Sequence, residues 1–440
     1  EMTYFPRNTF DQCVDFIVSD CQYGIDGALP MIYTNASGTV AESLYGRATK
    51  AAAYALKARV LLYAASPLFN GNADYAKFAN EDGTLLFAPK DDSKWGKAAA
   101  AAKEAIDKIE GSSYYGLYYS DEPDNGYRNY MELFLPSKKW NKEYIFARNQ
   151  GTGYSDNIHQ EKCMAANGMG GWSGLCPTQE LVDAYEMANG STPIIGYNAD
   201  GTPIINGASG YSETGFAATA GKHYPAGVYN MYVGREPRFY ASINFNGQQW
   251  RGRQLEFWQG GKDGINVSKV DYCCTGYLLR KTADEGVDVI NGKGGMKEAS
   301  ILFRVGSLYL DYAEALNEAE GPVDDVYKYV DAIRKRAGLP GLAKGLDKDK
   351  MRERIQHERQ IELAFEAGHR YFDCHRWKIA EKTDNGYMHG MNITATNKVD
   401  YSKRSTVGDS RVFEKKHYLF PIPQSEMDKQ IGLVQSPYWE

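Results

Sequence analysis

Two kinds of sequence alternate along this chain, and their order limits the folds it can adopt. One kind is rich in alanine and places apolar residues at helical spacing. The other is rich in glycine, asparagine and tyrosine. Residues 46–67 are the clearest example of the first kind, with apolar residues on one predicted helix face at Ala52, Leu56, Val60, Tyr63 and Ala64. Because proline cannot continue a helix, we expect this helix to end at Pro67.

Further helices are predicted near both ends of the chain. Residues 8–29 and 94–109 read as helices, and consecutive alanines at 98–102 would let a neighbouring helix approach closely. Toward the C-terminus, helical spacing returns at residue 300, and a second helix is expected at 326–337. A helix, a short turn and a helix within about 38 residues is typical of tetratricopeptide repeats.

The middle of the chain predicts short strands and long loops. The turn sequences 80–84 and 198–202 share the pattern Asn-x-Asp-Gly-Thr, which favours β-hairpins. Residues 143–148 and 239–245 read as strands, and residues 349–372 predict one further long helix.

These elements predict a mostly α fold, a tetratricopeptide-like helix-pair scaffold with a loop-rich irregular subdomain that carries short β-hairpins. We expect residues 1–440 to form a single unit. In it, residues 1–111 and 300–440 would build the helical scaffold, and residues 112–299 the loop-rich, ligand-binding subdomain.

Composition excludes several classes of function. The net charge is −6, so the chain has no surplus of basic residues to neutralise phosphates, and we expect no nucleic-acid partner. No stretch of 18 residues is apolar and free of charge, so no membrane-spanning helix is predicted. The 7 cysteines contain no CxxC pair, and no zinc, P-loop, dinucleotide or GxSxG pattern occurs. We therefore expect neither a cofactor nor a metal site.

The densest run of charged residues is 357–377, where several glutamates, arginines and histidines follow each other closely. Its histidines lack the HExxH spacing, and nothing supplies a third metal ligand. Acids and arginines at helical i, i+4 spacing predict an ion-pair lattice that ties this helix to its neighbours. The acidic turn 121–126 lacks the EF-hand pattern and is expected to be a solvated turn rather than a calcium site.

Aromatic residues in the middle loops are the best candidates for ligand contacts. The chain has 33 Tyr, 17 Phe and 7 Trp, and flat rings stack on the apolar faces of sugars. Trp172 lies among glycines, and Trp250 follows an Asn-Gly-Gln-Gln turn whose amides suit hydroxyl groups. The predicted ligand-binding residues are Trp172, Trp250, Tyr154, Trp258, His159 and Tyr211. For any single one of these rings, packing in the hydrophobic core is the simpler interpretation.

Seven segments, in order, resemble the motifs of the SusD/RagB family of Bacteroidetes surface proteins. They cover the chain nearly end to end, at residues 46–63, 234–240, 275–281, 308–317, 333–340, 357–377 and 418–427. Cys374-His375 departs from the usual family residues in the sixth segment. Relatives carry a lipobox cysteine and further helices in front of the region that this chain matches, and part of their ligand site comes from that front. We therefore expect the anchor and first helices to be missing from this sequence.

The resemblance implies a non-catalytic glycan-binding protein of the cell outer membrane, a surface-exposed lipoprotein. It would capture polysaccharide or oligosaccharide and deliver it to a SusC-like TonB-dependent transporter. RagB-like members serve peptide uptake instead, and an acidic, tyrosine-lined cleft would suit basic peptides. A glycoside hydrolase, recognised by two apposed carboxylates with perturbed pKa, and a plain helical-repeat scaffold are the remaining alternatives.

Overall fold

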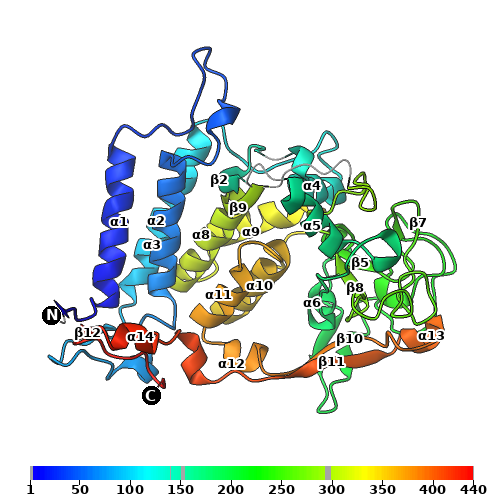
Figure 1. Ribbon diagram of the computed structural model, residues 1–440. Coiled ribbons are helices and arrows are strands. Elements are labelled where there is room, and N and C mark those ends of the chain that lie inside the picture. The colour runs from blue at the N-terminus through cyan, green and yellow to red at the C-terminus, as the bar shows by residue number, and fades with distance from the viewer. Residues whose placement is uncertain (1–2, 139, 150–153, 293–298, 440) are drawn as a thin grey trace.

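The computed structural model describes residues 3–138, 140–149, 154–292 and 299–439. Helices from the two ends of the sequence lie side by side in one helical layer (Figure 1). They are α1 (Phe10–Asp26), α2 (Lys50–Ala65), α3 (Ser93–Gly111), α8 (Val305–Glu320), α9 (Asp324–Arg336), α10 (Lys348–Glu362) and α11 (His369–Arg376). Helix α2 packs between α1 and α3, and α3 packs against α8, which also contacts α9 and α10. None of the helices in the described part of the chain is long and apolar enough to cross a membrane.

Short helices and strand pairs form the rest of the molecule. The helices are α4 (Gly126–Leu133), α5 (Tyr154–Met164), α6 (Gln179–Ala184), α7 (Pro237–Ser242), α12 (Ala380–Thr383), α13 (Lys398–Tyr401) and α14 (Gln424–Met427). The 3₁₀ helices are η1 (Glu42–Leu44), η2 (Ala73–Tyr75), η3 (Pro136–Lys138), η4 (Asn167–Met169), η5 (Asn230–Tyr232) and η6 (Lys415–Tyr418). The mostly helical fold with short antiparallel strand pairs that the sequence predicts is confirmed.

Strands occur only in pairs among the described residues. The antiparallel pairs are β2 (Tyr144–Asn149) with β9 (Ala299–Arg304), β3 (Ile194–Tyr197) with β4 (Pro203–Ile205), β5 (Ile243–Phe245) with β8 (Tyr277–Leu279), β6 (Gln249–Trp250) with β7 (Arg253–Gln254), and β10 (Gly386–Met391) with β11 (Arg404–Arg411). A parallel pair, β1 (Thr3–Tyr4) with β12 (Gln430–Ile431), joins the two ends of the chain. The turn at 198–202 closes the β3–β4 hairpin as predicted, whereas the turn at 80–84 closes only an isolated bridge between Ala79 and Leu85.

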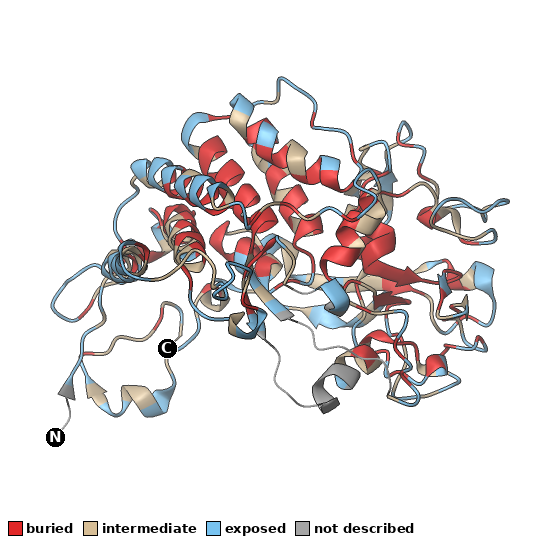
Figure 2. Ribbon diagram, turned by 90° about the horizontal axis from the view of Figure 1, so that it is seen from above, coloured by how far each residue is buried: buried red, intermediate tan, exposed pale blue. Residues whose placement is uncertain are grey.

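Small side chains bring the helices of the layer close together. In α3, Ala98, Ala102 and Ala105 are fully buried, which confirms that the alanine run allows close approach. Figure 2 shows buried residues gathered in the inner helices and exposed residues on the outer ones. The predicted face of α2 is wrong, because Leu56 is exposed and the buried residues are mostly small ones such as Ala51, Ala55 and Ala58. Since α2 lies between two helices, alanines make many of its contacts, and Tyr54 and Leu62 are the larger residues on its buried surface.

Three predicted elements differ in the structure. Residues 299–304 form a strand rather than the start of a helix, because they pair with β2. Residues 239–245 begin inside the helix α7 and become a strand only at Ile243. The single helix predicted at 349–372 is interrupted between α10 and α11, where Phe365 (φ 63°) and Gly368 (φ 73°) adopt left-handed conformations.

A buried network of ion pairs connects the helical layer with the loop-rich part. The carboxylate of Glu362 in α10 lies 3.1 Å from Arg238 of α7 and 2.9 Å from Arg304, and it also pairs with Arg336. In the same network, Arg359 of α10 and Arg376 of α11 share the carboxylate of Asp373. All of these side chains are essentially inaccessible to water, and a buried charge is tolerated only when it is paired.

The prediction that residues 357–377 form an ion-pair lattice is confirmed, although many of the partners lie on other elements. Arg359 reaches Asp311 in α8 at 2.6 Å, and Arg376 bonds to Glu314 of the same helix. Glu366 binds Arg304 at 2.7 Å and the ammonium of Lys281 at 2.6 Å. The lattice therefore fixes the end of β8, two residues before Lys281, against the helical layer.

Candidate functional site

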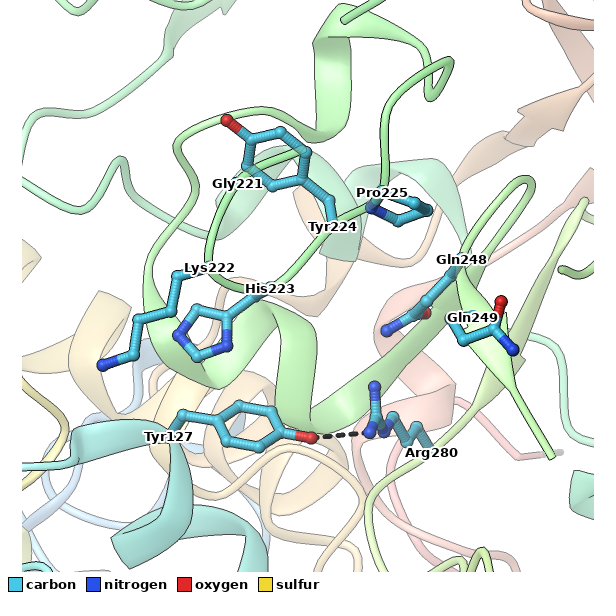
Figure 3. A pocket seen from close by; sticks show the side chains of 9 residues that line it. All are labelled: Tyr127, Gly221, Lys222, His223, Tyr224, Pro225, Gln248, Gln249 and Arg280. Atoms are coloured by element: carbon cyan, nitrogen blue, oxygen red, sulfur yellow. Dashed lines mark hydrogen bonds between the residues drawn. The ribbon is translucent and has the colours of Figure 1, made fainter. Parts of the chain in front are cut away.

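A cavity of about 320 Å³ opens in the loop-rich part, between α4, the loop 221–225, the turn before β6 and the end of β8 (Figure 3). Aromatic and polar side chains line it together. The lining residues are Tyr127, Gly221, Lys222, His223, Tyr224, Pro225, Gln248, Gln249 and Arg280.

Local backbone features bring these side chains together. In the loop, the Gly221 N–H donates to the Tyr224 carbonyl at 2.9 Å, and the Tyr224 ring folds over Gly221 so closely that a Cβ there would lie 2.4 Å from it. On the opposite wall, Gly247 takes a left-handed conformation (φ 86°) that turns the chain, so that Gln248 and Gln249 face the cavity. The Arg280 N–H donates to the Ser242 carbonyl at 2.8 Å, which anchors the residue that follows β8.

Aromatic rings form one wall of the cavity. The rings of Tyr127 and His223 stack with centroids 4.7 Å apart, and His223 continues to Tyr240 at 5.2 Å. Tyr224 also stacks on Tyr240, with centroids 6.1 Å apart. Tyr127, His223 and Tyr224 are half-buried, so each ring is fixed by its neighbours and keeps part of its surface open. This arrangement suits contact with a flat, partly apolar ligand.

Electrostatics keep the histidine of this wall uncharged. Burial, and then the nearby cations Lys222 and Arg280, lower the pKa of His223 to about 4. Burial also raises the pKa of the Tyr127 hydroxyl above its ordinary value. At neutral pH, His223 is therefore a neutral ring that can stack and exchange hydrogen bonds.

Arg280 links the aromatic wall to the polar side of the cavity. Its Nη2 donates a hydrogen bond to the Tyr127 hydroxyl at 2.5 Å (dashed in Figure 3). Its guanidinium also lies over the ring of Trp250, 4.6 Å from the centroid. The cation is thus held between an aromatic face and a hydroxyl acceptor.

Trp250 is not a ligand platform, which corrects the sequence prediction. Only 2% of its surface is exposed, and it belongs to the hydrophobic core of the loop-rich part. The polar turn before it does line the cavity, but the tryptophan itself points inward and supports Arg280. Tyr211 is likewise buried, with its hydroxyl bonded to Glu213 at 2.7 Å, and Trp258 is half-buried against the same core.

Trp172 lies on a second surface and does not line the cavity. Its side chain is 36% exposed, and Gly171 beside it has no room for a side chain, since a Cβ would lie 2.1 Å from the Ala165 carbonyl. The ring of His159 packs against Trp172 at 5.2 Å, and the ammonium of Lys162 lies 5.2 Å from the ring centroid. Helix α5 begins at Tyr154, whose side chain is outside the described residues. Trp172 and His159 therefore remain a predicted ligand surface.

The sequence analysis did not predict several of the residues that line the cavity. Tyr127 and Arg280 are 153 residues apart in the sequence, and their hydrogen bond exists only in the folded chain. The segment Gly221-Lys222-His223-Tyr224-Pro225 carried a usable signal, because it holds a cation and two rings between two turn-forming residues.

A cavity of about 450 Å³ in the helical layer contains two carboxylates, as the hydrolase alternative would require. Both are engaged in ion pairs. Glu314 binds Arg376 and the indole N–H of Trp377 at 2.7 Å, and Glu318 pairs with Arg352. Each carboxylate therefore already has a cationic partner. No cluster of three or more metal-binding side chains occurs within the part of the chain that the structure describes. In the acidic turn, Asp121 and Glu122 pair with Arg128.

Comparison with known proteins places these observations in a family. The SusD family model matches residues 136–439. Two curated relatives come from Formosa agariphila. SusD-like protein P25 is 42% identical over 82 residues, and SusD-like protein P2 is 29% identical over 154 residues. These matches span 18% and 32% of this chain, and only 15% and 26% of the length of the two relatives.

Solved structures match over almost the whole chain. BT4246 superposes with a TM-score of 0.80 at 27% sequence identity, covering 99% of this chain and 77% of that one. A SusD-like protein from Bacteroides fragilis, BF3747, has a TM-score of 0.69 at 27% identity, with 99% and 72% coverage.

Proposed function

The chain belongs to the SusD family, and we propose from this premise that it binds glycan in the cavity between Tyr127, His223, Tyr224 and Arg280. The bound ligand is a polysaccharide or oligosaccharide, held without chemical change. Family membership supports a role in glycan binding, and the cavity supplies a place for it.

The observation that carries the proposal is the pairing of half-open aromatic rings with hydrogen-bonding side chains in one cavity. A sugar ring has apolar C–H faces and equatorial hydroxyls. The stacked rings of Tyr127 and His223 offer surface for the faces, while Gln249 and Arg280 offer donors for the hydroxyls. Because these rings already stack on each other or on Tyr240, binding loses little side-chain entropy.

Capture at the cell surface is the second part of the proposal. The protein would sit on the outer membrane as a lipoprotein, through an N-terminal lipid, and deliver glycan to a SusC-like TonB-dependent transporter. Family membership supports these points. Peptide capture finds no comparable support here, since the cavity lacks the acidic side chains that would attract a basic peptide.

The test is a polysaccharide panel measured by affinity electrophoresis and calorimetry, with the Tyr224→Ala and Trp172→Ala variants in parallel. Stacking on one ring removes about 100 Å² from water, worth on the order of 2 kcal/mol, so Tyr224→Ala should weaken binding roughly 10- to 50-fold. Trp172→Ala tests the separate Trp172 surface, and unchanged binding in this variant assigns the glycan to the cavity.

Two results would contradict the proposal. If no glycan binds the unmodified protein, the function is wrong. If Trp172→Ala abolishes binding while Tyr224→Ala leaves it intact, the function stands but the site lies at the Trp172 surface. A melting temperature within a few degrees of the unmodified protein shows that each variant is folded.

A further inference from the structure

The cavity is positively charged in an acidic protein. Its lining contains the side chains of Lys222 and Arg280 and no aspartate or glutamate, although acidic residues outnumber basic ones in the whole chain by 56 to 50. His223, between these two cations, is neutral at physiological pH and adds no charge. The lining therefore carries two positive charges.

Neither cation is neutralised by a salt bridge within the described residues. Glu122 is within electrostatic range of Lys222 and forms its ion pair with Arg128 at 2.5 Å, and Glu285 accepts the Arg251 backbone N–H at 3.1 Å. Neither acid lines the cavity. This contrasts with the buried arginines of the ion-pair network, such as Arg304, which binds several carboxylates.

The guanidinium of Arg280 is held in position before any ligand arrives. Trp250 lies against its face, the Tyr127 hydroxyl accepts one of its N–H groups, and its neighbour Lys281 is fixed by Glu366. Among the described residues, that bond to Tyr127 is the one hydrogen bond its guanidinium donates. A planar guanidinium held this way suits the bidentate recognition of a carboxylate or a sulfate.

We propose that the cavity takes an anionic sugar unit, carrying a carboxylate or a sulfate ester, with Arg280 and Lys222 holding the anion and the aromatic wall contacting the ring. This inference rests on the proposed glycan-binding function and names its ligand class. Lys222, which is exposed at the rim, contributes long-range attraction, whereas Arg280 provides the oriented contact.

The experiment compares matched pairs of polysaccharides in which one member carries the anionic group and the other is neutral. Polygalacturonate is set against its methyl ester, and dextran sulfate against dextran, in calorimetric titrations at fixed ionic strength. We expect at least one anionic member to bind roughly 10-fold or more tightly than its neutral partner. The pair that shows the preference identifies carboxylate or sulfate as the recognised group.

Variants localise the effect. Arg280→Gln and Lys222→Gln should each weaken binding of the anionic polymer about 10-fold, and Arg280→Lys should recover only part of the loss, since an ammonium is not bidentate. Lys335→Gln is the matched control, because it removes one positive charge from an exposed site on α9, outside the cavity. Its affinity should stay within about twofold.

Each contrary outcome has a distinct meaning. Equal or tighter binding of the neutral polymers overturns the anionic preference and leaves the glycan-binding function standing. Binding that falls equally in Lys335→Gln and in the cavity variants shows attraction to net charge, which also overturns this inference. Absence of binding to all four polymers overturns this inference, and the proposed function is refuted with it when the polysaccharide panel also shows no binding.

Discussion

Replacing Glu362 by glutamine should remove about 3 kcal/mol of folding stability at neutral pH. The side chain is fully buried, and its carboxylate contacts the guanidinium groups of Arg238, Arg304 and Arg336. Glutamine keeps the shape and removes the charge. The arginines then depend on their other carboxylates. Glu143 remains for Arg304 and Arg336, so the expected loss lies at the lower end of the roughly 3–5 kcal/mol found when a buried ion pair is broken.

The pKa of Glu362 gives a second route to the stability that this carboxylate contributes, with the same magnitude. Burial alone would raise its pKa, but the surrounding arginines and Lys281 lower it from 4.5 to about 2. At roughly 1.4 kcal/mol for each tenfold change in proton affinity, the difference between the folded and unfolded chain is about 3 kcal/mol. Because the folded pKa is depressed, this stabilisation is complete above about pH 4.5 and is lost as the pH falls toward 2.

The assay is denaturant unfolding of both proteins between pH 7 and pH 3, followed by tryptophan fluorescence. Other carboxylates titrate in this range in both proteins, so the difference in unfolding free energy between the two isolates Glu362. That difference should be about 3 kcal/mol at pH 7 and should shrink steadily below pH 4.5. Glu353→Gln, exposed on the same helix, is the control and should change stability by less than ~0.5 kcal/mol.

The reasoning fails if Glu362→Gln costs less than ~1 kcal/mol at pH 7, since the network would then contribute little through this carboxylate. It also fails if the difference is independent of pH, because the loss would then come from altered packing. The folded fraction of the variant should still bind glycan, since Glu362 does not line the cavity.

Three further predictions concern the cavity and its surroundings. Trp250→Ala should destabilise the protein by roughly 3–5 kcal/mol in denaturant unfolding, as expected for a core tryptophan. A loss of stability below ~1 kcal/mol would contradict its place in the core. Tyr127→Phe should weaken glycan affinity several-fold with little change in melting temperature, because the ring stays while Arg280 loses its hydroxyl acceptor. If calorimetry shows unchanged affinity, Tyr127 does not position that arginine. Glycan affinity should be constant between pH 6 and pH 8, because His223 has a pKa of about 4 and stays neutral there. A change in affinity centred near pH 6.5 that is absent in His223→Ala would contradict this prediction.

Features set by neighbours in sequence were predictable here, and features set by distant partners were not. Helix α3 and the β3–β4 hairpin depend on local periodicity and on a turn sequence. Strand β9 could not be predicted, because its extended form depends on pairing with β2. The break between α10 and α11 was also missed, since Phe365 adopts a left-handed conformation that its residue type disfavours.

The candidate site shows the same division. The composition of the turn before Trp250 indicated amides suited to a ligand, and two of them line the candidate cavity. Composition cannot tell whether the tryptophan that follows points outward or into the core. That outcome depends on strands and helices far away in the sequence, which enclose Trp250 and leave Arg280 at the surface of its ring.

The ion-pair network explains why the family could be recognised from sequence while the ligand could not. The segments that resemble family motifs supply many residues of the buried ion-pair network. These residues include Arg238, Lys281, Glu362 and Glu366, which pairs with Arg304. Two residues at the cavity belong to the same segments, since Tyr240 follows Arg238 by two residues and Arg280 directly precedes Lys281. The network therefore fixes the backbone from which these side chains project. The remaining side chains of the wall, Tyr127, His223 and Tyr224, and the second cation, Lys222, come from outside the motif segments. In this chain the stacked rings and two cations without a salt bridge among the described residues are the basis for expecting an anionic sugar.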